Sequence, residues 1–122
     1  MENGKGLLRE ETINFAVLVS DVCDEIKGCG HYTGQLIRSS SSIGANVHEA
    51  KYAQSRADFI HKLEIALKES QETEYWIELI YRKGKIDHEV YKRLLNACGS
   101  IRRRLIASVT TAKRNGEDNQ AK

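Results

Sequence analysis

One part of the chain decides the fold: residues 35–50 read QLIRSSSSIGANVHEA, and residues 58–70, close behind, read DFIHKLEIALKES. In the first segment, single Ile, Val and Leu residues are separated by Ser, Gly and Ala at helical spacing. Small residues on a helix face let a second helix approach closely. We therefore expect two helices that pack tightly against each other. The facing small residues would be Ser40 and Gly44 on one helix and Ala66 and Ser70 on the other.

Outward from this part, apolar residues recur every three or four positions in four segments, which is the spacing of amphipathic helices. The segments cover about residues 8–27, 33–53, 56–83 and 88–114, and the polar tail 115–122 is expected to fray. The residues expected to face the core are Phe15, Leu18, Val19, Val22 and Ile26; Leu36, Ser40, Ile43, Val47 and Ala50; Ile60, Leu63, Leu67, Ser70 and Ile77; and Tyr91, Leu94, Cys98, Ile101, Leu105, Ser108 and Ala112.

The ends of these segments carry recognisable start and stop signals. Thr33, Ser55 and Asp87 stand where helix N-caps are expected, and Asp58 completes a capping box with Ser55. Glycines follow the first and third segments, as at many helix C-termini. One long helix running through residues 52–54 is the alternative, because no strong helix breaker stands there. The capping box favours a break between two helices.

These signals describe a single domain, residues 1–122, of the all-α class. Short connections between four helices force neighbours to run antiparallel, which predicts an antiparallel up-down-up-down four-helix bundle. A chain of 122 residues is long enough to bury a core without disulfides or metals. It also contains no proline, the commonest helix breaker.

The cysteines and the apolar runs indicate a cytoplasmic protein. Cys23, Cys29 and Cys98 are odd in number and lack C-x-x-C spacing, so we expect free thiols in a reducing compartment. The longest apolar run, residues 15–19, is far too short to span a bilayer. No apolar signal region stands near the N-terminus. We therefore expect no membrane contact.

The sequence carries no pattern for catalysis or cofactor binding. Four-helix bundles with di-iron centres need Glu-x-x-His on two helices, and no Glu in this chain is followed by His three positions later. His31, His48, His61 and His88 lie in different elements, without metal-ligand spacing. Phosphate-binding glycine loops and nucleophile elbows are also missing. We expect no enzymatic activity, no bound metal and no cofactor.

Charge is unevenly distributed, although the net charge is only +2. Residues 10–26 contain five acids and no Lys or Arg, whereas residues 90–116 contain seven bases and no acid. With Ile101 and Leu105 facing inward, Arg103 points outward, and Arg102 and Arg104 flank the apolar face. The two flanking arginines are expected to pair with acids of a neighbouring helix. The acids considered are Asp21, Asp24 and Glu25.

The outward bases of the last helix are candidates for contacts to nucleic-acid phosphates. They are Lys92, Arg93, Arg103, Lys113 and Arg114. The chain has no RNA-recognition aromatic motif. Any binding to RNA or DNA should therefore depend on shape and phosphate rather than on base sequence.

A second group of polar residues is expected along the second and third helices. It consists of Arg38, Asn46, Glu49, Glu69 and Glu74. One interpretation is a polar pocket for a base or a small ligand. The other is a structural network of arginine, carboxylate and amide groups that sets the helix register, because buried polar groups must find partners. We favour the structural network.

Residues 35–80 resemble the bacterial four-helix-bundle proteins first noticed as reading frames within intervening sequences of 23S ribosomal RNA genes. The accessory proteins of diversity-generating retroelements belong to the same structural group. The matching segments are QLIR at residues 35–38, SIGANV at 42–47, ADFIHKL at 57–63, IALKE at 65–69 and ETEYW at 72–76. The resemblance implies a homo-oligomer, commonly a ring of five subunits, that binds nucleic acid or ribonucleoprotein. It carries no catalytic motif.

Apolar residues that remain once each helix has one core-facing side also favour a homo-oligomer, because an isolated small bundle would leave them exposed. They are Ile37, Ile65, Trp76, Ile80, Leu95 and Ile106. The competing interpretation is a structural scaffold or adaptor for a protein partner, such as a reverse transcriptase. Phosphate binding weakens steeply as salt rises, whereas an apolar joint persists, so the two interpretations predict different salt behaviour.

Overall fold

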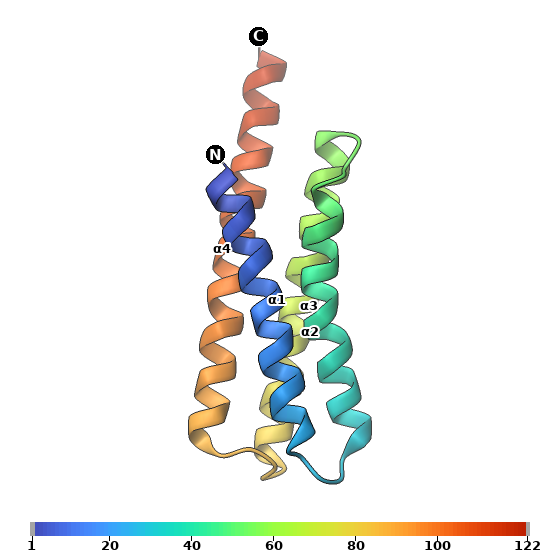
Figure 1. Ribbon diagram of the computed structural model, residues 1–122. Coiled ribbons are helices and arrows are strands. Elements are labelled where there is room, and N and C mark those ends of the chain that lie inside the picture. Colours follow the sequence, from blue (N-terminus) through green and yellow to red (C-terminus); the bar gives the residue numbers. More distant parts are fainter. Residues whose placement is uncertain (1, 122) are drawn as a thin grey trace.

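The chain folds into four helices that lie side by side. The structure is a computed structural model that describes residues 2–121, and the side chains of residues 6–116. The helices are α1 (Glu2–Asp24), α2 (Gly30–Ala50), α3 (Arg56–Arg82) and α4 (His88–Ala121). Successive helices run in opposite directions (Figure 1), and the described residues form no strand. The predicted all-α, antiparallel up-down-up-down four-helix bundle is confirmed.

The outer ends of α1 and α4 extend further than predicted. α1 already begins at Glu2, and α4 continues to Ala121 through the segment that was expected to fray from residue 115. No proline interrupts either end, and Gly6 and Gly116 both lie inside a helix. A single glycine lowers helix propensity by about 1 kcal/mol, which is too little to end a helix by itself. Lys122 lies outside the described residues.

The start of α2 also differs from the prediction, because the cap is not Thr33. The helix begins at Gly30, and its N-cap is Cys29, a non-glycine residue in the left-handed region with φ 45°. Gly28 before it has φ 80°, so two successive left-handed residues reverse the chain within the connection. The Thr33 hydroxyl donates back to the Gly30 carbonyl, 3.2 Å away, and caps no amide.

The predicted break between α2 and α3 is confirmed. α2 ends at Ala50 in a tightened turn, with hydrogen bonds such as that from Lys51 N to the His48 carbonyl, 3.2 Å. Ser55 Oγ then accepts from the Asp58 amide at 3.0 Å, as the capping box requires. The Asp58 carboxylate accepts in turn from the Gln54 amide at 3.4 Å.

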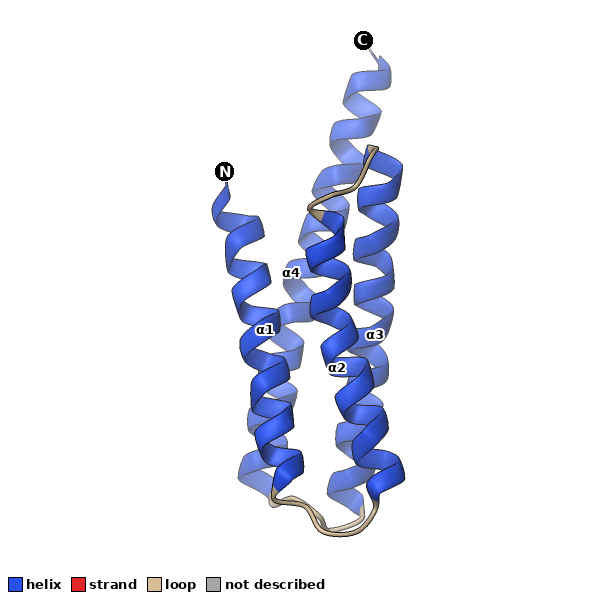
Figure 2. Ribbon diagram, turned by 45° about the vertical axis from the view of Figure 1, so that its right-hand side comes forward, coloured by secondary structure: helices blue, strands red, loops and turns tan. Residues whose placement is uncertain are grey.

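The connections at the opposite end of the bundle are short as well (Figure 2). Gly84, with φ 75°, ends α3: its amide donates to the Tyr81 carbonyl at 2.8 Å, and the Lys85 amide donates to the Ile80 carbonyl at 3.2 Å. This pair of bonds is the Schellman arrangement. Asp87 caps α4 as predicted, because its Oδ1 accepts from the Val90 amide at 2.9 Å.

The core follows the predicted apolar faces with a small rotation. The residues in the core are Leu8, Phe15, Val19 and Cys23; Leu36, Ile43, Val47 and Ala50; Leu63, Ala66, Ile77 and Ile80; and Leu94, Cys98, Ile101, Leu105 and Val109. Thr12, Ser39 and Thr73 are also fully buried, and none of these three was predicted. Of the predicted core residues, Leu18, Val22, Ile26, Ile60, Leu67, Tyr91 and Ser108 are only half-buried.

The small residues of α2 face different neighbours from those predicted. α2 and α3 do form the most extensive helix contact, and Ser39 Oγ there lies 2.9 Å from Thr73 Oγ1. Gly44, however, packs on α1 and not on α3: a Cβ at that position would lie 3.2 Å from Thr12 Oγ1 and 3.3 Å from Thr12 Cβ. The prediction for Gly44 is therefore corrected, because residues one position apart on a helix can face different neighbours.

Candidate nucleic-acid interface

α4 presents a row of exposed bases to solvent. Lys92, Arg103 and Arg114 are spaced by eleven residues, which is about 16.5 Å along the axis and only about 20° beyond three full turns. These three residues, named the basic stripe below, therefore lie almost in line. The positions between them on this side of α4 are uncharged, among them Asn96 and Thr110. The stripe thus contains no acid that would repel a phosphate.

The remaining two predicted bases, Arg93 and Lys113, lie on either side of the stripe and are also exposed. Lys113 Nζ is 3.0 Å from Glu64 Oε2 of α3, so part of its charge is neutralised. Lys92, Arg93 and Arg103 form no ion pair with any side chain of residues 6–116. These three bases are therefore available for phosphate.

Gly99 is a feature of this surface that the sequence did not single out. It is buried, and a Cβ built on it would lie 3.3 Å from Arg103 Nη1 and 3.6 Å from Arg102 Nη2. The Arg103 side chain therefore folds back over the bare backbone at Gly99. A glycine one turn before an exposed arginine on the same helix side is the sequence signal that would have indicated this.

The two arginines beside the apolar face of α4 pair with neighbouring helices, as predicted, but with other acids. Arg102 Nε is 3.2 Å from Glu74 Oε2 of α3, and Arg104 Nε is 2.8 Å from Glu11 Oε1 of α1. Ser100 Oγ also donates to Glu11 at 2.5 Å. The acids at residues 21–25 lie near the opposite end of α1, beside the start of α4 (Figure 1), so they are out of reach of Arg102 and Arg104.

The predicted polar group on α2 and α3 is divided among separate partners. Arg38 Nη1 lies 3.3 Å from Glu69 Oε1, and Arg38 also pairs with Glu72. Asn46, Glu49 and Glu74 do not join this pair: the Asn46 amide donates to the Ser42 carbonyl at 2.9 Å, Glu49 pairs with Lys62 at 2.9 Å, and Glu74 pairs with Arg102.

Glu72 is the member of this group that the sequence analysis missed. It lies three residues after Glu69 and so on the same side of α3, which is the signal that would have found it. A hydrogen bond from Trp76 Nε1 at 3.0 Å, followed by the bond from Arg38, lowers the pKa of the Glu72 carboxyl. Glu69 and Glu72 both pair with Arg38 and so connect α3 to α2. These ion pairs fix the register of the two helices.

These features belong to a chain whose sequence matches a known family. A family model described as "23S rRNA-intervening sequence protein" matches residues 8–107. The chain belongs to this family. A protein of unknown function from the S23 ribosomal protein family of Bacteroides thetaiotaomicron, known from a crystal structure, is 38% identical and has a similar fold, with a TM-score of 0.83. The alignment covers 88% of this chain and 98% of that chain.

A search of curated proteins found no match. The family resemblance inferred from residues 35–80 is confirmed at the level of the 23S rRNA-intervening sequence family. The matched range includes Lys92, Arg93 and Arg103, whereas Lys113 and Arg114 follow it. The link to diversity-generating retroelements stays a prediction.

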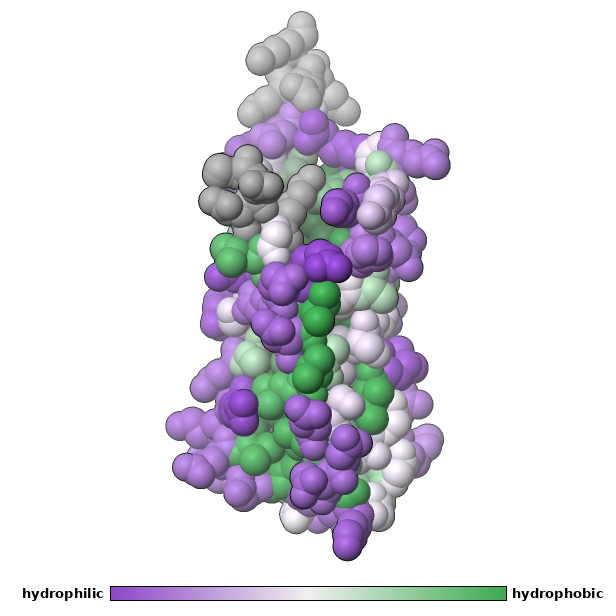
Figure 3. All heavy atoms as spheres, in the orientation of Figure 1, coloured by the Kyte–Doolittle hydropathy of each residue, from purple (hydrophilic) through white to green (hydrophobic). Residues whose placement is uncertain are grey.

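In this family member, apolar side chains of α1 and α2 remain exposed. Figure 3 shows apolar residues at the surface along α1. The exposed fractions of Ile13, Val17 and Ile37 are 41%, 54% and 41%. We name these three residues the α1–α2 apolar face. Ile13 and Val17 border a groove of about 420 Å³ that is also lined by Gly44 and Ala45. Exposed apolar area of this kind marks binding surfaces in many proteins.

The apolar residues predicted to remain outside the core differ in how far they are exposed. Ile37 and Ile106 are exposed, with fractions of 41% and 44%. Ile65, Trp76 and Leu95 are half-buried. Ile80 is completely buried, so the prediction for this residue is corrected: it lies one turn after Ile77 on the core side of α3.

The three cysteines are free thiols, and the described His, Cys, Asp and Glu side chains do not gather into a metal site. Cys23 and Cys98 are buried free thiols, and Cys29 is half-buried. Burial raises the pKa of Cys23 to about 11 and that of Cys98 to about 12. Within the described residues, no three His, Cys, Asp or Glu side chains are grouped as metal ligands. None of the described helices has the length and apolar character needed to cross a membrane.

Proposed function

We propose that the protein is a non-enzymatic, cytoplasmic homo-oligomer that binds RNA or other nucleic acid through α4. The observation that carries the proposal is the outer side of α4 between residues 90 and 116, a segment that contains seven bases and no acid. The basic stripe and Arg93 lie on it, and Lys92, Arg93 and Arg103 make no ion pair with the described side chains. Arginine and lysine placed in this way are the usual contacts to phosphate oxygens.

The binding would be governed by charge and shape. Each base that neutralises a phosphate releases a counterion, so affinity falls steeply with salt. The aromatic residues do not form an RNA-recognition motif, and the stripe is a single straight row on one helix, which suits a backbone more than base edges. The family name refers to intervening sequences of 23S rRNA, which makes an rRNA hairpin the first probe to test.

Oligomerisation is supported by the α1–α2 apolar face, which would otherwise stay exposed to water. A ring of five subunits is implied by the family resemblance. In a closed ring each subunit contributes its basic stripe, so several stripes act together on one nucleic acid, which raises the overall affinity without any new contact.

The test is a titration of a labelled RNA hairpin at two salt concentrations. The variant Arg93→Gln, Arg103→Gln, Arg114→Gln should bind more weakly, with a salt slope smaller by about two to three, while the oligomer stays intact. A matched control, Lys27→Gln, Lys68→Gln, Lys83→Gln, removes three exposed charges away from α4 and should bind almost like the native protein. Equal losses in the two variants would contradict a specific role for α4.

The second candidate is a scaffold or adaptor for a protein partner, such as a reverse transcriptase. The α1–α2 apolar face and its groove favour it, since an apolar partner surface could pack there. If the native protein binds neither RNA nor DNA even near about 50 mM salt, where phosphate contacts are strong, the scaffold function replaces the nucleic-acid function.

A further inference from the structure

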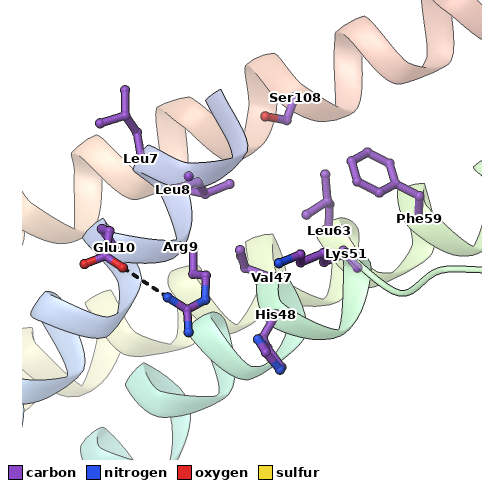
Figure 4. Close-up of a pocket in the computed structure, with 12 residues that line it drawn as sticks. Leu7, Leu8, Arg9, Glu10, Val47, His48, Lys51, Phe59, Leu63 and Ser108 are labelled. Carbon is purple, nitrogen blue, oxygen red and sulfur yellow. Dashed lines mark hydrogen bonds and ion pairs between the residues drawn. The ribbon is translucent and has the colours of Figure 1, made fainter. Parts of the chain in front are cut away.

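A cavity of about 580 Å³ lies at the end of the bundle where α2 ends and α3 begins (Figure 4). All four helices contribute to it: α1 through residues 6–10, α2 through Val47, His48 and Ala50, α3 through Phe59 and Leu63, and α4 through Ser108; Lys51, just after α2, also lines it. This volume falls within the range of about 300–1,000 Å³ that small-molecule sites occupy. The basic stripe of α4 takes no part in it.

The walls of the cavity are apolar. Leu8, Val47 and Leu63 are 4%, 8% and 2% exposed, and Ala50 and Phe59 continue the same surface. A hydrocarbon or aromatic group placed here would leave water and contact aliphatic and aromatic carbon, which is favourable in proportion to the apolar area covered. The interior therefore fits an apolar tail.

The mouth of the cavity is cationic. Arg9 and Lys51 supply its positive charge and His48 lies beside them, and Figure 4 shows the Arg9 side chain leaving α1 on the side where His48 and Lys51 lie. Glu10 is the single acid among the lining residues, and it is already bound to Arg9 at 3.0 Å. Lys51 forms no ion pair with the described side chains; its Nζ lies 5.8 Å from the Tyr52 ring centroid.

Two polar residues of the cavity mouth also line the α1–α2 groove. Arg9 and His48 line both this cavity and the α1–α2 groove, so they stand between two apolar spaces. An anionic group bound there has an apolar space on either side. Ser108 and Leu63 line only the end cavity, whereas Ala45 lines only the groove, so the two spaces can be filled separately by substitution.

We propose that the end cavity binds a free amphiphilic carboxylate, such as a medium-chain fatty acid. The hydrocarbon tail occupies the space between Leu8, Val47 and Leu63, and the carboxylate pairs with Lys51 and Arg9. An arginine side chain can donate two parallel hydrogen bonds to a carboxylate, and a lysine adds a point charge. This binding is separate from the proposed nucleic-acid function, in which the basic stripe of α4 contacts the phosphates of a polymer.

The experiment is calorimetry of the native protein with decanoate, decanol and decylammonium, each kept below its micelle concentration or, for decanol, its solubility limit. Decanoate should bind once per chain, and the neutral and cationic probes should bind at least about tenfold more weakly, because they lose a charge-assisted contact. Decanol binding as tightly as decanoate would overturn the proposal, and so would the absence of decanoate binding. Binding to phosphatidylglycerol vesicles without binding to free decanoate would overturn it too.

Variants locate the site within the fold. Lys51→Gln and Arg9→Gln should each weaken decanoate binding about tenfold or more, and Lys85→Gln, at the other end of the bundle, should not change it. Ser108→Phe fills the end cavity and should abolish binding, whereas Ala45→Phe fills the groove and should not. Circular dichroism verifies that each variant is folded, and the charge variants test the site if Ser108→Phe fails to fold. Unchanged binding in both charge variants would contradict the proposal.

Discussion

At the scale of single residues, Gly44 shows best how the absence of a side chain sets the fold. Its backbone lies against Thr12, and a Cβ would stand 3.2 Å from the Thr12 hydroxyl oxygen. The sequence predicts a small residue at a close helix contact, and the structure bears this out. The identity of the opposite helix could not be predicted, because it depends on the rotation of α2 within the bundle.

We expect Gly44→Leu to destabilise the protein by about 1–3 kcal/mol, because the larger side chain forces α1 and α2 apart. Gly34→Leu is the matched control: Gly34 also lies in α2, but a Cβ there meets nothing within 4 Å. Urea denaturation of the two variants measures the difference. Equal free energies of unfolding would contradict the close contact between Gly44 and Thr12.

The cysteines offer a second test at this scale. Burial holds the pKa of Cys23 at about 11 and that of Cys98 at about 12, so at pH 8 both are protonated thiols, which react poorly with disulfide reagents. Half-buried Cys29 in the α1–α2 connection should react alone in the native protein. Cys29→Ser should then abolish the rapid reaction with a colorimetric disulfide at pH 8. Rapid reaction of all three native thiols would disprove the burial.

At the scale of elements, the sequence predicted best those features that depend only on residues close together in the chain, such as helix caps. The capping box of Ser55 and Asp58 and the cap by Asp87 are local, and both are confirmed. The start of α2 was missed because a cysteine with φ 45° carries no compositional signal. The partners of Arg102 and Arg104 were predicted wrongly, because they depend on the axial offset between α1, α3 and α4 in the bundle.

Ser55 and Thr33, both predicted as N-caps from the sequence, can be compared directly. Ser55→Ala removes the acceptor of the Asp58 amide and should cost about 0.5–2 kcal/mol of stability. Thr33→Ala, at the position that only the sequence presented as a cap, should cost much less, because the Thr33 hydroxyl accepts no amide proton of α2 in this way. Thermal unfolding of the two variants gives the comparison. A larger loss in Thr33→Ala would mean that α2 begins elsewhere.

At the scale of the whole molecule, the acids of α3 pair with bases that face them from α2 and α4. Glu69 and Glu72 bind Arg38 of α2, and Glu74 binds Arg102 of α4. The bases that face neighbouring helices are thereby neutralised, while the basic stripe faces water. Which polar residues meet in pairs could not be predicted from spacing alone, because the five predicted residues lie at different heights along the bundle.

The last prediction concerns assembly. We expect light scattering to give a homo-oligomer at micromolar concentration, with five times the chain mass if the family resemblance holds in this respect. The variant Ile13→Asp, Val17→Asp places two charges on the α1–α2 apolar face and should yield folded monomers, because burying unpaired carboxylates in a subunit joint is costly.

Tyr75→Asp is the control for that variant, since Tyr75 is 59% exposed on α3 and should leave the mass unchanged. If the monomeric variant also loses most of its RNA affinity while its basic stripe is intact, several stripes must act together, as a ring requires. If it keeps full affinity, one α4 suffices for binding. A native protein that is monomeric at micromolar concentration would contradict the proposed ring, because the ring assigns the apolar face of α1 and α2 to contact between subunits.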